Sequence, residues 1–188
     1  LAKNLLNFSI PRNAKSAADI GCGSGISTIT LKGLLDREAK ITGYDNSDAM
    51  LEVAKKETDG EILFRPMNEI FQNRHDYIFS NAAIWQIDHS EIKIVFKDIL
   101  LPKSTFVFNI PCDFQKGFKY LTNQTLFEDM VGEKVAEFRT STYCYNGLID
   151  EMRAYLQVPV FRHNTELPAL IPNKIFSTNW LFVAITKF

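Results

Sequence analysis

The 188-residue chain has the composition of an ordinary globular domain, with 46% hydrophobic and 23% charged residues. A chain of this length buries about 70% of its unfolded surface around one core, so no disulfide or metal is needed to hold the fold together. The net charge of −1 and the pI of 6.4 exclude a strong positive field that would attract a polyanion.

Short apolar runs alternate with amphipathic segments over the first part of the chain. Strands are predicted at residues 16–20, 40–44, 61–65, 77–80 and 105–110, and helices at 26–35, 47–56 and from Asp88 through Ile99. Strand–helix alternation at this spacing is typical of βαβ units with a parallel sheet. Because such crossovers are right-handed, we expect a doubly wound layer with helices on both faces.

Polar residues at the start of each predicted helix support these boundaries. Ser24 can cap the first helix, and either Asn46 or Ser47 can cap the second. Asp88 and Glu91 have the spacing of a capping box for the third helix.

Residues 112–146 interrupt the alternation with aromatic-rich loops and a helix-like piece at 124–131. A helix at 147–156 and strands at 158–162 and 180–186 are predicted to follow. Since there is no internal repeat or linker, residues 1–188 are interpreted as a single domain. The interruption is then an insertion between strands five and six, which we expect to form a lid over a substrate.

A glycine turn, Asp19-Ile-Gly-Cys-Gly-Ser-Gly25, follows the first strand. Its glycines let the backbone come close to a ligand, and the next helix offers unpaired N–H groups to a polar group. Ile26 stands where a dinucleotide-binding turn has its third glycine, which disfavours a nicotinamide-dependent oxidoreductase. Asp45 ends the second strand, where a carboxylate accepts hydrogen bonds from the two hydroxyls of a ribose. The alternative for Asp45 is a cap for the next helix.

These motifs resemble those of the class I S-adenosylmethionine-dependent methyltransferases. Residues 19–25 are similar to motif I, residues 43–51 to the ribose-binding segment, and residues 76–83 to motif IV of the malonyl-carrier-protein and trans-aconitate methyltransferases. Residues 99–108 stand where the family often has Leu-Lys-Pro-Gly-Gly, with Lys103 and Ser104 replacing the two glycines. The resemblance covers residues 16–110 and implies a Rossmann-like, mostly parallel sheet of seven strands.

The resemblance also implies S-adenosylmethionine as the cofactor. Asp19 and the turn backbone would hold its amino-acid end, and Asp45 its ribose. Asn46 and Met50 would flank the adenine, and plain helix packing is the alternative for Met50. Asn68 stands where the family often has an Asp that contacts the adenine amine. The full set of implied cofactor residues is Asp19, Gly21, Cys22, Gly23, Gly25, Asp45, Asn46, Met50, Asn68, Ser80 and Asn81.

The segment after the fourth strand bears on the methyl acceptor. Asn81 is followed by Ala82 and Ala83 rather than by the Pro-Pro-aromatic sequence of enzymes that methylate nucleobase or amide nitrogens, so nucleic acid is not expected as a partner. The prediction is therefore methyl transfer to a small molecule or a carrier-bound acyl group, with carboxylate O-methylation as one candidate, because an ionised carboxylate needs no base. The alternative is an inactive cofactor-binding relative that serves as an interaction subunit.

The acceptor pocket and the catalytic groups are the least defined by the sequence. Trp85, Tyr143 and Tyr145 are predicted wall or lid residues. No catalytic residue is identified, and His89, His163 and Tyr143 remain as candidates. Arg139 or Arg153 could hold a substrate carboxylate, although an exposed ion pair is the favoured interpretation of both. His75 is predicted to lie in a loop.

The remaining signals concern location and partners. The three cysteines are scattered, as expected for reduced thiols, and no metal site is predicted. The longest apolar runs are too short to span a membrane, so no membrane partner and a cytoplasmic location are expected. The sequence leaves the oligomeric state open.

Overall fold

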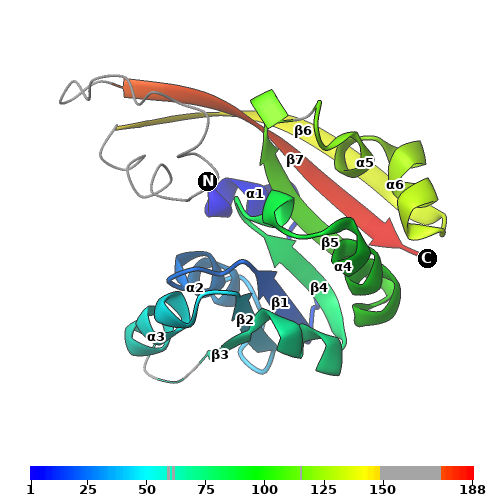
Figure 1. Ribbon diagram of the computed structural model, residues 1–188. Coiled ribbons are helices and arrows are strands. Elements are labelled where there is room, and N and C mark those ends of the chain that lie inside the picture. Colours follow the sequence, from blue (N-terminus) through cyan, green and yellow to red (C-terminus); the bar gives the residue numbers. More distant parts are fainter. Residues whose placement is uncertain (59, 61, 115, 149–174) are drawn as a thin grey trace.

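The computed structural model describes residues 1–58, 60, 62–114, 116–148 and 175–188 (Figure 1). It contains one seven-stranded sheet in the order β3-β2-β1-β4-β5-β7-β6. Strands β1 to β5 are mutually parallel, and β7 runs antiparallel to both of its neighbours, β5 and β6. The predicted doubly wound, mostly parallel sheet of seven strands is confirmed.

The helices and strands follow one another along the chain in the order α1 (Ala2–Phe8), β1 (Ser16–Ile20), α2 (Ile26–Lys32), β2 (Lys40–Asp45), α3 (Asp48–Glu57), β3 (Leu63–Pro66), η1 (Met67–Gln72), β4 (His75–Ser80), η2 (Ile84–Gln86), α4 (His89–Ile94), η3 (Val95–Ile99), β5 (Leu100–Pro111), η4 (Cys112–Phe114), α5 (Lys119–Thr122), α6 (Gln124–Val131), β6 (Val135–Leu148) and β7 (Ile175–Lys187). Helices cover both faces of the sheet: α1 packs beside α2 on one face, while α4 packs on α6, and η1 on η3, on the other.

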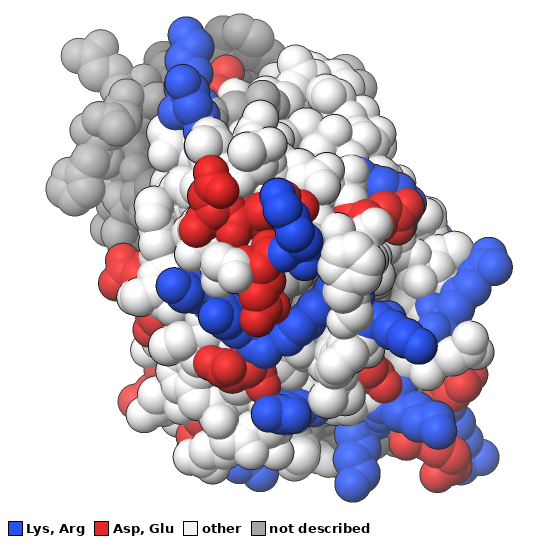
Figure 2. Space-filling view, turned by 90° about the vertical axis from the view of Figure 1, so that its right-hand side faces the viewer, with Lys and Arg blue, Asp and Glu red and all other residues white. Residues whose placement is uncertain are grey.

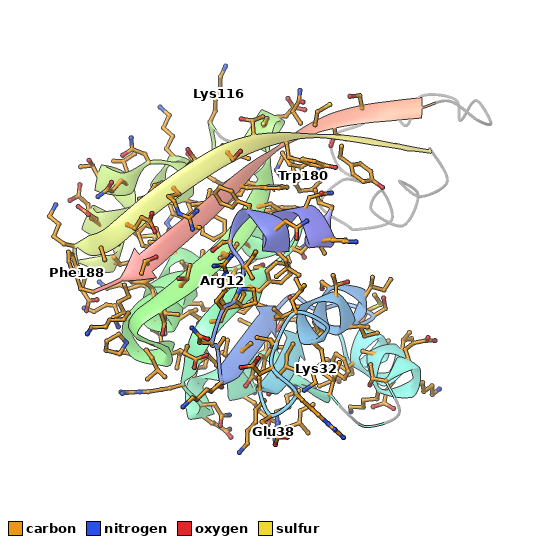
Figure 3. All side chains as sticks on the ribbon, turned by 180° about the vertical axis from the view of Figure 1, so that it is seen from behind. Arg12, Lys32, Glu38, Lys116, Trp180 and Phe188 are labelled. Atoms are coloured by element: carbon orange, nitrogen blue, oxygen red, sulfur yellow. The ribbon has the colours of Figure 1, made fainter. Side chains whose placement is uncertain are left out.

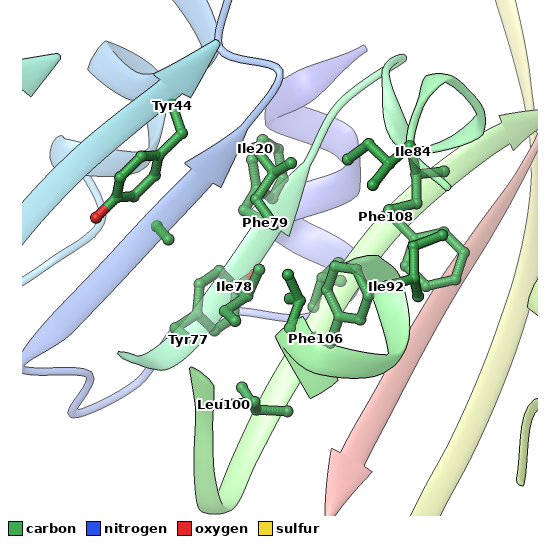
Figure 4. Packing of buried hydrophobic residues seen from close by; sticks show 14 of the residues in the cluster. Ile20, Tyr44, Tyr77, Ile78, Phe79, Ile84, Ile92, Leu100, Phe106 and Phe108 are labelled. Carbon is green, nitrogen blue, oxygen red and sulfur yellow. The ribbon is translucent and has the colours of Figure 1, made fainter. Parts of the chain in front are cut away.

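The centre of the sheet is buried on both faces and forms an aromatic core (Figure 4). Phe79 of β4 and Phe106 and Phe108 of β5 are fully buried. The rings of Phe96 and Phe127 meet edge to face at 5.0 Å and join η3 to α6. Strands covered by helices on both sides need apolar side chains at successive positions, which explains why these segments read as continuous apolar runs.

Local sequence signals explain most helix starts. The Ser47 hydroxyl accepts from the Met50 N–H at the start of α3, and Asp88 and Glu91 form the predicted capping box of α4. Ser24 does not cap α2. That helix begins directly after Gly25, whose φ of 86° lets the turn pass straight into the helix.

The largest difference from the sequence-based expectation is β6. Residues 135–146, predicted as part of a lid, form most of a 14-residue strand that pairs with β7 along its whole length. As an edge strand it has exposed positions between its aromatic residues, so it lacks the apolar run that marks the inner strands. The predicted helix at 147–156 is wrong at Gly147 and Leu148, which end this strand. The rest of that helix and the predicted strand at 158–162 lie outside the described residues.

The β6–β7 pair extends beyond the rest of the sheet. The last pair between β5 and β7 is Pro111 with Trp180, whereas β6 and β7 remain paired as far as Leu148 with Ile175. Because β7 is antiparallel to β5, the extra five residue pairs project past the carboxyl ends of the parallel strands. At roughly 3.3 Å per residue, this extension is about 16 Å long, and Figure 1 shows it at the end of the hairpin that lies near α1.

Candidate active site

The strand order places one crevice in the sheet. Chain connections leave β1 towards β2 on one side and β4 towards β5 on the other, so the order reverses between β1 and β4. In open α/β sheets, ligands bind beyond the carboxyl ends of the strands at such a switch point. The glycine turn after β1 and the Ser80–Ala83 segment after β4 meet at this place.

Backbone hydrogen bonds tie the glycine turn to the end of β2. The N–H groups of Gly21 and Cys22 both donate to the carbonyl oxygen of Tyr44, at 2.8 and 3.0 Å. The Asp45 carboxylate accepts from the N–H of Gly23 at 2.8 Å through Oδ2 and from the N–H of Ser47 at 2.9 Å through Oδ1. Asp45 therefore joins the turn to the start of α3, and each of its oxygens keeps a lone pair for another donor.

Asp19 lies beneath the turn and is completely buried. Its Oδ2 accepts hydrogen bonds from the hydroxyls of Ser27 at 2.6 Å and Thr28 at 2.7 Å, whereas Oδ1 accepts none from the described residues. Burial raises the pKa of Asp19 to about 7, against the lowering effect of the two hydroxyls. A buried carboxylate oxygen without a donor is costly, and a proton or a ligand cation would relieve that cost.

Neighbouring side chains approach the turn most closely at Gly21 and Gly25. A Cβ built on Gly21, whose φ is 72°, would lie 2.3 Å from Cβ of Ala83. A Cβ on Gly25 would meet the Phe64 ring at 3.0 Å, while one on Gly23 would meet only the Met50 methyl group, at 3.5 Å. The loop after β4 thus lies directly against the start of the glycine turn.

A buried amide organises the loop after β4. Asn109 of β5 is fully buried; its Oδ1 accepts from the N–H of Ala82 at 2.6 Å, and its Nδ2 donates to Oδ1 of Asn81 at 3.0 Å. Ala82 has a φ of 59°, which is uncommon for a residue other than glycine. Ser80 is fully buried, and its hydroxyl donates to the carbonyl oxygen of Ile20 at 2.9 Å. Ser80 therefore joins β4 to β1, and Asn81 is the polar side chain that remains at the carboxyl end of β4.

Aromatic side chains from three elements form a cluster next to this loop. The rings of Trp85 in η2 and Trp180 in β7 lie 5.9 Å apart, and Figure 3 shows Trp180 on the α1 side of the β6–β7 pair. Tyr143, the cross-strand partner of Trp180, stacks on Phe182 at 5.3 Å, and its hydroxyl accepts from Asn4 of α1 at 2.8 Å. We call Trp85, Trp180, Tyr143 and Phe182 the aromatic cluster. Tyr145, also half-buried, lies two residues further along β6.

The structure separates the other predicted residues from this cluster or leaves them exposed. Asn46 and Asn68 are exposed at the ends of β2 and β3, on the same edge of the sheet as the turn. His89 is exposed at the start of α4, where its ring centroid lies 3.5 Å from that of Tyr120. Arg139 pairs with Glu137 at 3.1 Å and covers the Phe8 ring, in agreement with the favoured ion-pair interpretation. His163 and Arg153 lie outside the described residues.

His75 is corrected from a loop residue to the first residue of β4. It is buried between the hydroxyls of Ser16, at 2.9 Å, and Tyr44, at 3.4 Å, and desolvation lowers its pKa to about 4. A neighbouring cavity of about 260 Å³, lined by Arg12, Asp76 and Lys103 among others, lies at the amino ends of β4 and β5. Both features are at the edge of the sheet opposite the glycine turn, so neither belongs to the candidate site.

Three features of the described part of the chain concern surface charge, metal-binding groups and helix length. Blue and red side chains alternate on the face shown in Figure 2, with no large field of one sign. Within the described ranges, no group of three or more His, Cys, Asp or Glu side chains is arranged to hold a metal ion. None of the helices in the described part of the chain is long and apolar enough to cross a bilayer.

Sequence reasoning missed three polar contributors to the site and two aromatic ones. Ser27 and Thr28 are on the buried face of α2, and their positions eight and nine residues after Asp19 carry no recognisable signal. Asn109 lies within an apolar strand. Because a buried amide needs hydrogen-bond partners, a single Asn in such a strand could have indicated a polar contact there. Trp180 and Phe182 lie in a strand that was predicted, but their contacts with Trp85 and Tyr143 could not be inferred without the register of β7.

Comparison with known proteins agrees with this geometry. Residues 17–100 match the family model described as "Methyltransferase domain". Trans-aconitate 2-methyltransferase of Escherichia coli O1:K1 / APEC is 26% identical over 153 residues, covering 80% of this chain and 60% of the relative. The corresponding Streptomyces coelicolor protein is 33% identical over 116 residues, covering 56% of this chain and 37% of that one. The chain thus spans about 60% of the length of the first of these relatives.

Solved structures show the same fold. The YcgJ protein of Bacillus subtilis superposes with a TM-score of 0.67 at 13% identity, covering 99% of this chain and 97% of that one. An O-methyltransferase of Bacillus cereus, solved in complex with SAH, gives a TM-score of 0.56 at 14% identity, with coverage of 99% and 80%. The chain therefore has the Rossmann-like fold that these structures share. The chain is similar to class I S-adenosylmethionine-dependent methyltransferases, over residues 17–100 in the family model and over 80% of its length in the first relative.

Proposed function

We propose that this chain binds S-adenosylmethionine at the switch point and transfers its methyl group to a small carboxylate. The observation that carries the proposal is the buried Asp19 beneath the glycine turn, with Oδ1 accepting from no described residue. The ammonium group at the amino-acid end of the cofactor would supply this oxygen with a positively charged hydrogen-bond donor. The crowded glycines and the Asp45 lone pairs fit a nucleoside that approaches the backbone closely.

When bound, S-adenosylmethionine supplies a methyl group on a positively charged sulfur, with a neutral thioether as the leaving group. The protein then has to align the acceptor oxygen with the methyl carbon and exclude water. Asn81 would hold the acceptor, and the aromatic cluster would form one wall of its site. An ionised carboxylate needs no base, which agrees with the position of His75 at the opposite edge of the sheet from Asn81.

The lid is proposed in a form different from the one expected from the sequence. In this part of the predicted lid, residues 119–122 form α5 and residues 124–131 form α6, and α6 packs on α4 on one face of the sheet. The extension of β6 and β7 past Pro111 and Trp180 instead projects on the edge where the glycine turn lies. We propose that this extension, with Tyr145 on it, borders the acceptor site.

The relatives support the acceptor class. They are named trans-aconitate 2-methyltransferases, and trans-aconitate is a tricarboxylate. A test combines purified protein with S-adenosylmethionine labelled in its methyl group and a panel containing trans-aconitate, other di- and tricarboxylates, acyl-carrier-bound acids, nucleic acid and protein. We expect transfer to a carboxylate. Transfer only to nucleic acid or to protein side chains would contradict the proposal, and cofactor binding without any transfer would favour the inactive interaction subunit.

A further inference from the structure

Asn109 lies where β5 continues beyond the end of β4. The parallel pairing of the two strands ends at Ser80 with Phe108, and β5 continues to Pro111. Asn109 is therefore the first residue of β5 beside the turn that leaves β4. It is fully buried, and both ends of its amide are used within this turn.

The hydrogen bonds of Asn109 set the direction of two amide groups. The backbone N–H of Ala82 can only donate, so the atom of Asn109 that it meets at 2.6 Å is the oxygen. The nitrogen of Asn109 must then face Asn81, and because an amide nitrogen can only donate, the atom it meets at 3.0 Å is Oδ1 of Asn81. A main-chain donor thus determines the orientation of both side chains, which contact distances alone would leave open.

One consequence concerns the free end of Asn81. With Oδ1 engaged by Asn109, its Nδ2 carries two N–H donors, and none of the described residues accepts from them. Asn81 is only half-buried, and the residues that follow it lie against the glycine turn, where Ala83 would touch a Cβ on Gly21. The donors therefore lie at the carboxyl end of β4, where the methyl acceptor is proposed to bind.

We propose that Asn109 is a positioning residue that orients Asn81 so that its N–H donors face an oxygen of the methyl acceptor. The inference rests on the proposed function and extends it to two residues. Donors at this place favour an acceptor that presents an ionised carboxylate, one oxygen of which accepts from Asn81 while the other attacks the methyl group. In that step an O–CH3 bond forms, the S–CH3 bond breaks with its electron pair returning to sulfur, and no proton is transferred.

Exchanging Asn109 for an acid of the same shape reverses the arrangement. In Asn109→Asp, one oxygen still accepts from Ala82, but the other, when ionised, cannot donate to Asn81, which then gains by turning its nitrogen inward and its oxygen outward. The matched control is Asn123→Asp, an exposed cap of α6 whose Oδ1 accepts from the Leu126 N–H, a bond that Asp also makes. Isothermal titration of each protein with S-adenosylhomocysteine, and then of the loaded protein with trans-aconitate, citrate and malonate, separates the two ligands.

We expect wild type and Asn123→Asp to bind S-adenosylhomocysteine and at least one of the three carboxylates. Asn109→Asp should keep its affinity for S-adenosylhomocysteine within about twofold and lose roughly tenfold to a hundredfold in carboxylate affinity, as expected for one hydrogen bond to a charged group. The loss should shrink as the pH is lowered, because a protonated carboxyl can again donate to Asn81. A purely structural defect would not recover in this way.

Other outcomes would overturn the inference. Failure of wild type to bind S-adenosylhomocysteine would refute the proposed function itself. Binding of S-adenosylhomocysteine without any of the three carboxylates would refute the carboxylate acceptor and with it the role of Asn109. An unchanged carboxylate affinity in Asn109→Asp would refute the role of Asn109 alone. If Asn109→Asp does not fold, Asn81→Asp provides the same test, because it keeps the oxygen that meets Asn109 and replaces the outward donor. Unchanged carboxylate affinity in that variant would equally contradict the inference.

Discussion

Replacing Gly21 by alanine tests the contact between the glycine turn and the loop after β4. The new Cβ would lie 2.3 Å from Cβ of Ala83, so one backbone segment must move. The residue would also have to keep a φ of 72°. Gly132 has nearly the same φ, 73°, and a Cβ there would meet nothing within 4 Å. Gly132→Ala therefore measures the cost of the left-handed backbone alone.

The two contributions can be given separate magnitudes. The left-handed conformation costs an L-residue about 1–2 kcal/mol, and overpacking typically costs a further 1–3 kcal/mol. Gly21→Ala should thus lower the free energy of unfolding by roughly 2–5 kcal/mol. Gly132→Ala should lower it by only about 1–2 kcal/mol. Since domains are stable by about 5–15 kcal/mol, both variants should remain folded enough to measure.

Urea denaturation followed by the fluorescence of the buried Trp85 and Trp180 measures these losses. Titration with S-adenosylhomocysteine on the same samples should show that Gly21→Ala, but not Gly132→Ala, weakens cofactor binding. Equal destabilisation by the two variants, or undiminished cofactor affinity in Gly21→Ala, would refute the close approach of Ala83 to the turn.

Three further predictions concern charged groups. The pKa of His75 is about 4 in the folded protein, below its ordinary 6.5. Its contribution to the free energy of unfolding is therefore complete above pH 6.5, and up to about 3 kcal/mol is lost as the pH falls through 4. Urea titrations should show this loss in wild type and not in His75→Gln. The pKa of Asp19 is raised from 3.8 to about 7, so its contribution is complete below pH 3.8 and is lost as the pH rises through 7; relative to Asp19→Asn, unliganded wild type should lose stability over that interval, and an identical pH profile would contradict this. Asp45→Ala should weaken S-adenosylhomocysteine binding by about 1–3 kcal/mol in calorimetry, and an unchanged affinity would remove Asp45 from the site.

The sequence predicted the parallel half of the fold well because its signals are local. Strand β1, the glycine turn and helix α3 were recognised from apolar runs, special backbone positions and caps such as Ser47. Ser24 shows the limit of such signals: a polar residue stood at the right place, yet Gly25 at positive φ started the helix without a cap. The family resemblance also rested on local motifs in turns, and not on the residues of the core.

The antiparallel half was less predictable because its pairing is non-local. Strand β6 has no apolar run, and what defines it is its register with β7, whose first residue lies 27 positions beyond the last residue of β6. The predicted lid therefore included residues that belong to a strand. Tyr143 lies on that strand, stacks on Phe182 of the aromatic cluster and accepts a hydrogen bond from Asn4. Asn109 was missed on similar grounds, since its partners, Asn81 and Ala82, are 28 and 27 residues away.

The central claim is that the turn between Asp19 and Gly25 binds S-adenosylmethionine. Isothermal titration of the purified chain with S-adenosylhomocysteine and, separately, with NAD tests it most directly. We expect micromolar binding of S-adenosylhomocysteine, no binding of NAD, and binding of S-adenosylhomocysteine weakened by about 1–3 kcal/mol when Asp45 is replaced by alanine. Binding of NAD, or no binding of S-adenosylhomocysteine by the folded protein, would contradict it.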